Sequence, residues 1–169
     1  MRKVGNGRFF SIVFILYKKE TMANPTAPIL VSPSDMTLVI GNHIVFVFVV
    51  PSDTDNDILV FRIELDTNNP PSSSSGSYKV NESRFSHNLK TNGNWQVKNS
   101  GGSYVQMPTG GVDSTYYGRD ARVIIRKQDT PNFPDINGMW YWRISAGDGM
   151  LQAPIFNKVI FGQAIFGGV

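Results

Sequence analysis

Three aspartates stand two residues apart just after the most apolar stretch of the chain: Asp53, Asp55 and Asp57. Ca²⁺ binds about six to eight oxygen atoms, and closely spaced carboxylates supply several of them. Ile58 occupies the place of the glycine that the common Ca²⁺-binding loop needs. The alternative is a polar turn in which the aspartates accept hydrogen bonds from nearby backbone N–H groups. The three residues are therefore the candidate Ca²⁺ ligands, and no other cofactor is predicted.

Aromatic side chains are a second group that could make contacts, because exposed rings stack on sugars and pack on protein partners. Trp140 and Trp142 stand two residues apart and share one face of a strand, which places both in the core. Tyr141 lies between them and faces the other way. The predicted contact residues of this kind are Trp95, Tyr116, Tyr117 and Tyr141.

Residues that support catalysis are scarce. The chain has two histidines, His43 and His87, and no cysteine, which excludes disulfides, thiol catalysis and cysteine-bound zinc. No nucleophile motif or phosphate-binding loop occurs. Nothing in the sequence fixes the spacing of Glu64, Asp66 and Glu82 as a catalytic carboxylate pair. We therefore predict no catalytic residue and no enzymatic activity.

The distribution of charge argues against nucleic acid as a partner. The chain has 16 basic and 13 acidic residues and a pI of about 9.2. Five basic residues and one glutamate lie within residues 1–21, so this segment carries +4 and residues 22–169 carry −1. A nearly neutral domain lacks the basic surface that binds phosphate backbones.

Residues 1–21 form a basic and apolar extension ahead of a single domain at residues 22–169. The apolar run at residues 9–17 is too short for a membrane span, which needs about 20 residues. A secretory signal also has a basic start and an apolar centre, but here charges follow the apolar run directly. Three interpretations stay open: a signal-like segment, an arm that packs on a neighbouring subunit, and a misassigned start with translation beginning at Met22.

Alternation with a period of two predicts β-strands throughout the domain. In residues 43–50 the even-numbered residues face one way and the odd-numbered valines face the other. Both faces are apolar, so one of them lies in the core and the other is covered by a loop or a partner. In residues 58–66 the odd-numbered residues point inward and the even-numbered ones outward. Two prolines and four consecutive serines make residues 68–77 a flexible loop. Further strands are expected at residues 29–33, 85–89, 95–97, 104–107, 121–127, 139–146 and 155–161.

The many short strands and the absence of a helical period indicate an all-β fold. The predicted architecture is an antiparallel β-sandwich of about seven to nine strands.

Two segments share a pattern with a known kind of domain. Residues 25–66 contain Ser32-Pro33-Ser34-Asp35, an apolar strand and the aspartate-rich turn. Residues 138–149 contain Tyr141-Trp142-Arg143 and then Asp148-Gly149. Together they resemble the fibronectin type III and immunoglobulin-like domains of phage structural proteins and bacterial surface proteins. The resemblance implies a sandwich of this type, which carries many different functions.

From this resemblance we expect a non-enzymatic virion structural or accessory protein: a capsid decoration, neck or tail component that binds a repeating protein lattice in many copies. The apolar residues 164–169 either complete the sandwich or pair with a neighbour, which adds Ile165 and Phe166 to the candidate contacts. The alternative is a bacterial cell-surface adhesion or carbohydrate-binding module with a glycan partner. The expected location is the virion, or the cell surface for the alternative.

Overall fold

The computed structural model describes residues 23–34, 37–39, 43–77, 79–83, 95–126, 138–148 and 158–166. The N-terminal extension at residues 1–21 and the strand expected at residues 85–89, with His87, lie outside this range. The described residues form ten strands and one 3-10 turn, and none of them forms an α-helix. The all-β prediction is confirmed, with more strands than the seven to nine expected.

One sheet, named sheet A here, has five strands in the order β1-β3-β8-β6-β7. All of its neighbouring strands are antiparallel. The strands are β1 (Ile29–Ser32), β3 (His43–Val49), β8 (Asp120–Arg126), β6 (Trp95–Lys98) and β7 (Tyr104–Gln106). The 3-10 turn η2 (Ser114–Tyr116) precedes β8.

The second sheet, sheet B, has the order β2-β10-β9-β4-β5. Its strands are β2 (Thr37–Val39), β10 (Lys158–Phe166), β9 (Gly138–Asp148), β4 (Leu59–Asp66) and β5 (Lys79–Glu82). Neighbouring strands of sheet B are antiparallel, except that β2 and β10 are parallel to each other. Strands β1 and β2 belong to different sheets, and Pro33, which follows a cis peptide bond, ends β1 between them.

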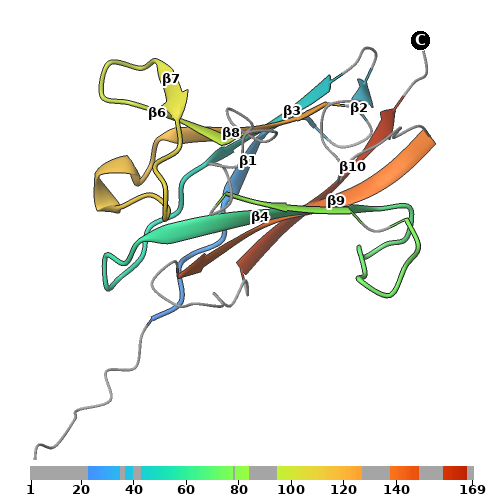
Figure 1. Cartoon of the computed structure of the whole chain (residues 1–169), viewed down its shortest axis with the longest axis horizontal. Coiled ribbons are helices and arrows are strands. Elements are labelled where there is room, and N and C mark those ends of the chain that lie inside the picture. The colour runs from blue at the N-terminus through green and yellow to red at the C-terminus, as the bar shows by residue number, and fades with distance from the viewer. Residues whose placement is uncertain are drawn as a thin grey trace, which may run out of the picture.

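The two sheets form two layers with an apolar core between them (Figure 1). Strand β3 contributes Ile44, Phe46 and Phe48, Val50 follows it directly, and β4 contributes Leu59, Phe61, Ile63 and Leu65, all of them buried. The inward face predicted for β4 is therefore confirmed, and in β3 the even-numbered residues form the core face, a choice that the sequence had left open.

Aromatic rings join the two layers. Phe46 of sheet A contacts Trp142 of sheet B edge to face, with ring centroids 5.0 Å apart. Phe48 contacts Phe61 in the same way at 4.9 Å. Such pairs stabilise a core by about 0.5–1.5 kcal/mol beyond their buried area.

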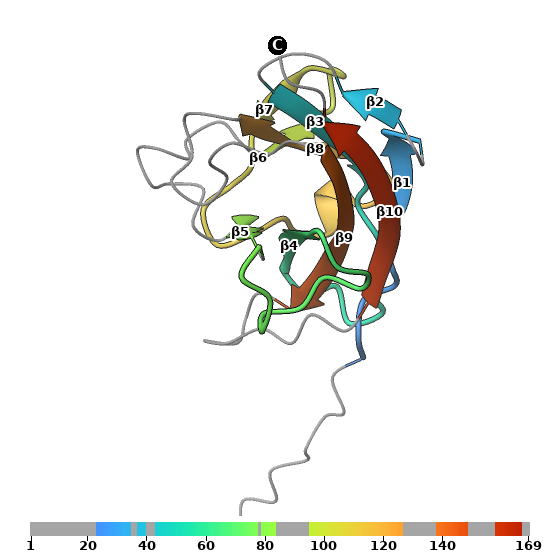
Figure 2. The same ribbon diagram turned by 90° about the vertical axis from the view of Figure 1, so that its right-hand side faces the viewer.

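The end of the chain completes sheet B. Strand β10 pairs with β9 along its whole length, and the two strands run side by side in Figure 2. Ile165 pairs with Met139 on one side and Leu38 on the other. The predicted last strand is therefore longer than expected and includes the first residues of the apolar tail. The sequence signals used above did not predict the short strands β2 and β5.

Candidate functional site

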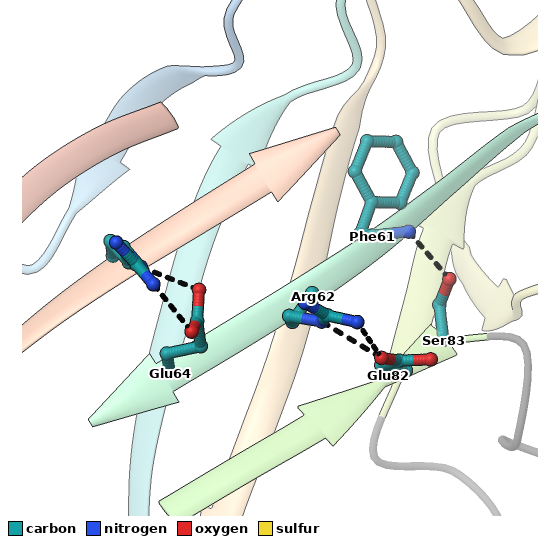
Figure 3. Close-up of polar contacts among 6 residues, drawn as sticks. Phe61, Arg62, Glu64, Glu82 and Ser83 are labelled. Carbon is teal, nitrogen blue, oxygen red and sulfur yellow. Dashed lines mark hydrogen bonds and ion pairs between the residues drawn. The ribbon is translucent and has the colours of Figure 1, made fainter. Parts of the chain in front are cut away.

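The outward face of β4 is buried, in contrast to the exposed face that was predicted. Val60 is 1% exposed, Glu64 3% and Asp66 0%. The Arg143 guanidinium, across the β4–β9 pairing, donates hydrogen bonds of 2.5 and 2.6 Å to the two Glu64 carboxylate oxygens (Figure 3). Two charge-assisted hydrogen bonds of this kind fix both side chains and compensate the burial of the glutamate.

Strand β5 extends the same face. The Arg62 Nε and Nη2 atoms donate to Glu82 Oε1 at 2.8 and 2.5 Å. The Ser83 hydroxyl accepts a 2.8 Å hydrogen bond from the Phe61 backbone N–H (Figure 3). The sequence did not fix the spacing of Glu64, Asp66 and Glu82, and each of them has hydrogen-bond donors within the fold. Glu64 and Glu82 form the ion pairs given above, and Asp66 accepts the hydrogen bonds described next.

Asp66 lies at the end of β4 and organises the serine-rich loop. Its carboxylate accepts hydrogen bonds from the backbone N–H groups of Asn68 (3.2 Å) and Ser72 (3.1 Å) and from the hydroxyls of Ser75 (2.9 Å) and Ser77. Burial alone would raise the pKa of Asp66, but these hydrogen bonds, that of Ser77 first, outweigh it and lower the pKa. The loop at residues 68–77, which was predicted to be flexible, is therefore held by hydrogen bonds to the buried Asp66 carboxylate.

The outer face of sheet A is apolar over β1, β3 and one position of β8. Ile29 and Val31 of β1 are 64% and 53% exposed. The odd-numbered valines of β3 are half-buried on this face. The register pairs Ile29 with Val49, and Val45 with Ile124, so these side chains adjoin. We name this group the apolar half of the outer face: Ile29, Val31, Val45, Val47, Val49 and Ile124.

The rest of the same face, over β8, β6 and β7, carries polar and aromatic side chains. The Arg122 guanidinium lies 3.9 Å from the centroid of the Tyr104 ring and donates a 2.6 Å hydrogen bond to Gln96. Lys98 Nζ forms a 2.6 Å ion pair with Asp120, which raises the pKa of the lysine. Arg122, Tyr104, Lys98, Gln96 and Asp120 thus form a connected polar half beside the apolar half.

Trp95 does not belong to the surface. It is 0% exposed, stacks on Phe61 with centroids 6.4 Å apart, and donates a 2.6 Å hydrogen bond from its indole to Asn81 Oδ1. The prediction of Trp95 as a contact residue is wrong. Its strand β6 pairs with β8, and Trp95 lies on the core face of this pair. Trp140 and Trp142 are in the core as predicted.

The predicted tyrosines are only partly accessible. Tyr116 and Tyr117 are half-buried and pack against the core, and the Arg119 guanidinium lies 5.6 Å from the Tyr116 ring. Tyr141 is half-buried on the face of β9 opposite Trp142, as expected. The side chains of Ile165 and Phe166 lie outside the described part, but their backbones are inside sheet B.

The three candidate Ca²⁺ ligands have different surroundings. Asp53 is buried, Asp55 is exposed and accepts a 2.5 Å hydrogen bond from the Ala23 N–H, and Asp57 is half-buried. Burial and then the charge of Asp148 raise the pKa of Asp57. Asp148, at the end of β9, therefore lies near this group. The sequence did not indicate this because Asp148 is far from the three aspartates along the chain.

No three histidine, cysteine or acidic side chains among the described residues are arranged to hold a metal ion by themselves. His43 is exposed at the start of β3. Across the same described ranges, no helix is long and apolar enough to cross a membrane.

Comparison with known proteins gives no relative. The chain matches no family model, and no curated protein or solved structure matches it either. The geometry of the faces and loops is therefore the basis for assigning a function.

Proposed function

We propose that this chain is a non-enzymatic virion structural protein, a capsid decoration, neck or tail component, that binds a repeating protein lattice through the outer face of sheet A. The observation that carries the proposal is the apolar half of that face. Six β-branched side chains adjoin there on the solvent side of the sheet, two of them more than half exposed.

We infer further that the sandwich is of the immunoglobulin or fibronectin type III kind. The order β1-β3-β8-β6 corresponds to strands A, B, E and D of an immunoglobulin domain, and β10-β9-β4-β5 to strands G, F, C and C′. The contact of Phe46 with Trp142 joins the equivalents of strands B and F, which a disulfide links in antibody domains. This inference supports the likeness to phage structural domains.

The composition of the outer face favours a protein partner. Interfaces between proteins have an apolar centre and are enriched in arginine and tyrosine, which often dominate the binding energy. Here Arg122 and Tyr104 lie directly beside the valines, at the Val47–Arg122 pair. One such group of six apolar side chains on each copy suits weak contacts that add up over a lattice.

The alternative, a carbohydrate-binding or adhesion module, has less support from the described side chains. Sugars stack on open aromatic rings, whereas arginine guanidinium groups lie over the Tyr104 and Tyr116 rings. Trp95, which would be the best stacking residue, is inside the core.

Virus particles purified on a density gradient from cells that carry the gene test the proposal. Mass spectrometry should find the chain in the particles in many copies. Recombinant wild-type protein should rebind particles that lack it, and Val47→Glu should weaken this binding by at least about 30-fold, as expected for a charge at an interface centre. Ser73→Glu, in the exposed loop after β4, is the matched control and should bind like the wild type.

Two results would refute the proposal. One is recovery of the chain from the cell surface with none in purified particles. The other is equal binding of Val47→Glu and wild type. Specific binding on a glycan array that is lost in Tyr141→Ala would establish the alternative function.

A further inference from the structure

Three segments meet at one end of the molecule, where the β3–β4 turn lies near η2 (Figure 1, left). Leu59 pairs with Asp148 in sheet B and with Val112 in an isolated bridge. The Tyr117 hydroxyl donates a 2.6 Å hydrogen bond to the Asp57 carbonyl oxygen. These contacts hold the turn against the end of β9 and the segment before β8.

Asp53 is the unusual residue of this end. It is 5% exposed, and neither of its carboxylate oxygens has a hydrogen-bond partner among the described residues. A carboxylate removed from water without hydrogen bonds or an opposite charge is strongly unfavourable. Asp66, at the other end of β4, is equally buried but accepts four hydrogen bonds. The Asp53 carboxylate thus requires a group that balances it.

The neighbours of Asp53 add negative charge. Burial, followed by the charges of Asp148, Asp53 and Asp55, raises the pKa of Asp57. Burial, followed by carboxylates of which Asp53 is the first, raises the pKa of Tyr117 to about 12. The charges of Asp53, Asp55 and Asp148 thus lie close enough to act on Asp57, and a cation among these carboxylates would be favoured.

We propose that this end of the molecule binds a Ca²⁺ ion, with Asp53 as the buried ligand and Asp57 and Asp148 as the neighbouring carboxylates. Because no three acidic side chains in the described ranges converge by themselves, backbone carbonyl and water oxygens complete the site. Ca²⁺ accepts such a mixed set of about six to eight oxygens in flexible geometry. Mg²⁺ demands a stricter octahedron, and Zn²⁺ prefers nitrogen and sulfur ligands.

The ion would join three segments that are far apart in sequence, and it stabilises the fold independently of any lattice partner. Thermal unfolding of the full chain tests this. Protein treated with chelator is melted in EDTA and in CaCl₂ up to about 10 mM, because weak sites have dissociation constants of about 0.1–1 mM. Binding at this excess should raise Tm by about 3–10 °C.

Asp53→Asn should abolish the Ca²⁺-dependent rise in Tm. In EDTA the same variant should melt no lower than the wild type, because it removes an unbalanced buried charge. Asp113→Asn is the control at the same end: its carboxylate already accepts hydrogen bonds from the Thr115 N–H and hydroxyl, so the rise should persist. A wild-type Tm that does not change with Ca²⁺, or a rise in the Tm of Asp53→Asn as large as that of the wild type, would overturn the proposal.

Terbium luminescence gives a second readout that does not depend on stability. Tb³⁺ replaces Ca²⁺ at oxygen sites and emits when a nearby aromatic ring is excited. Emission should appear on binding, fall on addition of Ca²⁺, and weaken in Tyr117→Phe because its ring adjoins Asp57. Emission that Ca²⁺ does not displace, or no emission, would contradict the site even if Asp53→Asn fails to fold.

Discussion

Trp95 and Trp142 offer a matched test of the core, because the same substitution should have different effects at the two sites. Both residues are 0% exposed. The Trp95 indole N–H donates a 2.6 Å hydrogen bond to Asn81 Oδ1, and Asn81 is itself buried. The Trp142 indole N–H is buried and finds no hydrogen-bond partner within the described residues.

The magnitudes follow from these surroundings. Replacing either indole by a phenyl ring loses about 1–2 kcal/mol of apolar burial and packing. At Trp95 the change also removes the donor to Asn81, which costs about 1–3 kcal/mol because a buried acceptor loses its partner. At Trp142 the change removes a buried N–H donor that has no hydrogen-bond acceptor, so about 1–3 kcal/mol of unfolding free energy is recovered. Trp95→Phe should therefore destabilise the protein by at least about 2 kcal/mol more than Trp142→Phe.

Equilibrium unfolding in urea measures this difference, provided that the dependence of the unfolding free energy on urea is the same in both variants. A double variant, Trp95→Phe with Asn81→Leu, is the control and should recover part of the loss, since donor and acceptor are removed together. Equal losses in the two single variants, or a larger loss in Trp142→Phe, would refute the reasoning.

Two further predictions concern buried charges on sheet B. Arg143→Met should cost about 3 kcal/mol in unfolding free energy, because the buried Glu64 loses two hydrogen bonds. The double variant Arg143→Met with Glu64→Leu should recover most of this loss. Additive losses from the two substitutions in urea unfolding would contradict the prediction. The lowered pKa of Asp66 means that its stabilising contribution is complete above the ordinary value of 3.8 and is lost as the pH falls below it. The stability difference between wild type and Asp66→Asn should therefore stay constant above about pH 5 and shrink below about pH 4 in chemical unfolding at a series of pH values; a gap that widens in acid would contradict it.

The inward face of β4 could be predicted from the sequence because alternation is a local property. A strand with one apolar stripe places that stripe in the core whatever its neighbours are. In β3 the sequence showed two apolar faces, but not which of them is the core face. What alternation does not give is the strand next to β3, so the neighbouring Ile29 and Ile124 were not predicted as parts of one surface.

The differences between prediction and structure arise from contacts across long sequence distances. Trp95 was predicted as a contact residue, but its burial depends on the pairing of β6 with β8, which the local sequence does not show. Glu64 looked solvated because Arg143 is 79 residues away in the chain. The serine-rich loop looked flexible because its hydrogen bonds depend on one carboxylate at the end of β4.

Cysteine labelling tests the outer face of sheet A most directly, because the chain contains no cysteine of its own. Ile29→Cys places a thiol on the apolar half, and Ser73→Cys places one in the exposed loop after β4. Both thiols should react rapidly with a maleimide in the free protein. On the virus particle we expect protection at position 29 and unchanged labelling at position 73. Equal labelling of position 29 in free and particle-bound protein would contradict the assignment of this face as the binding surface.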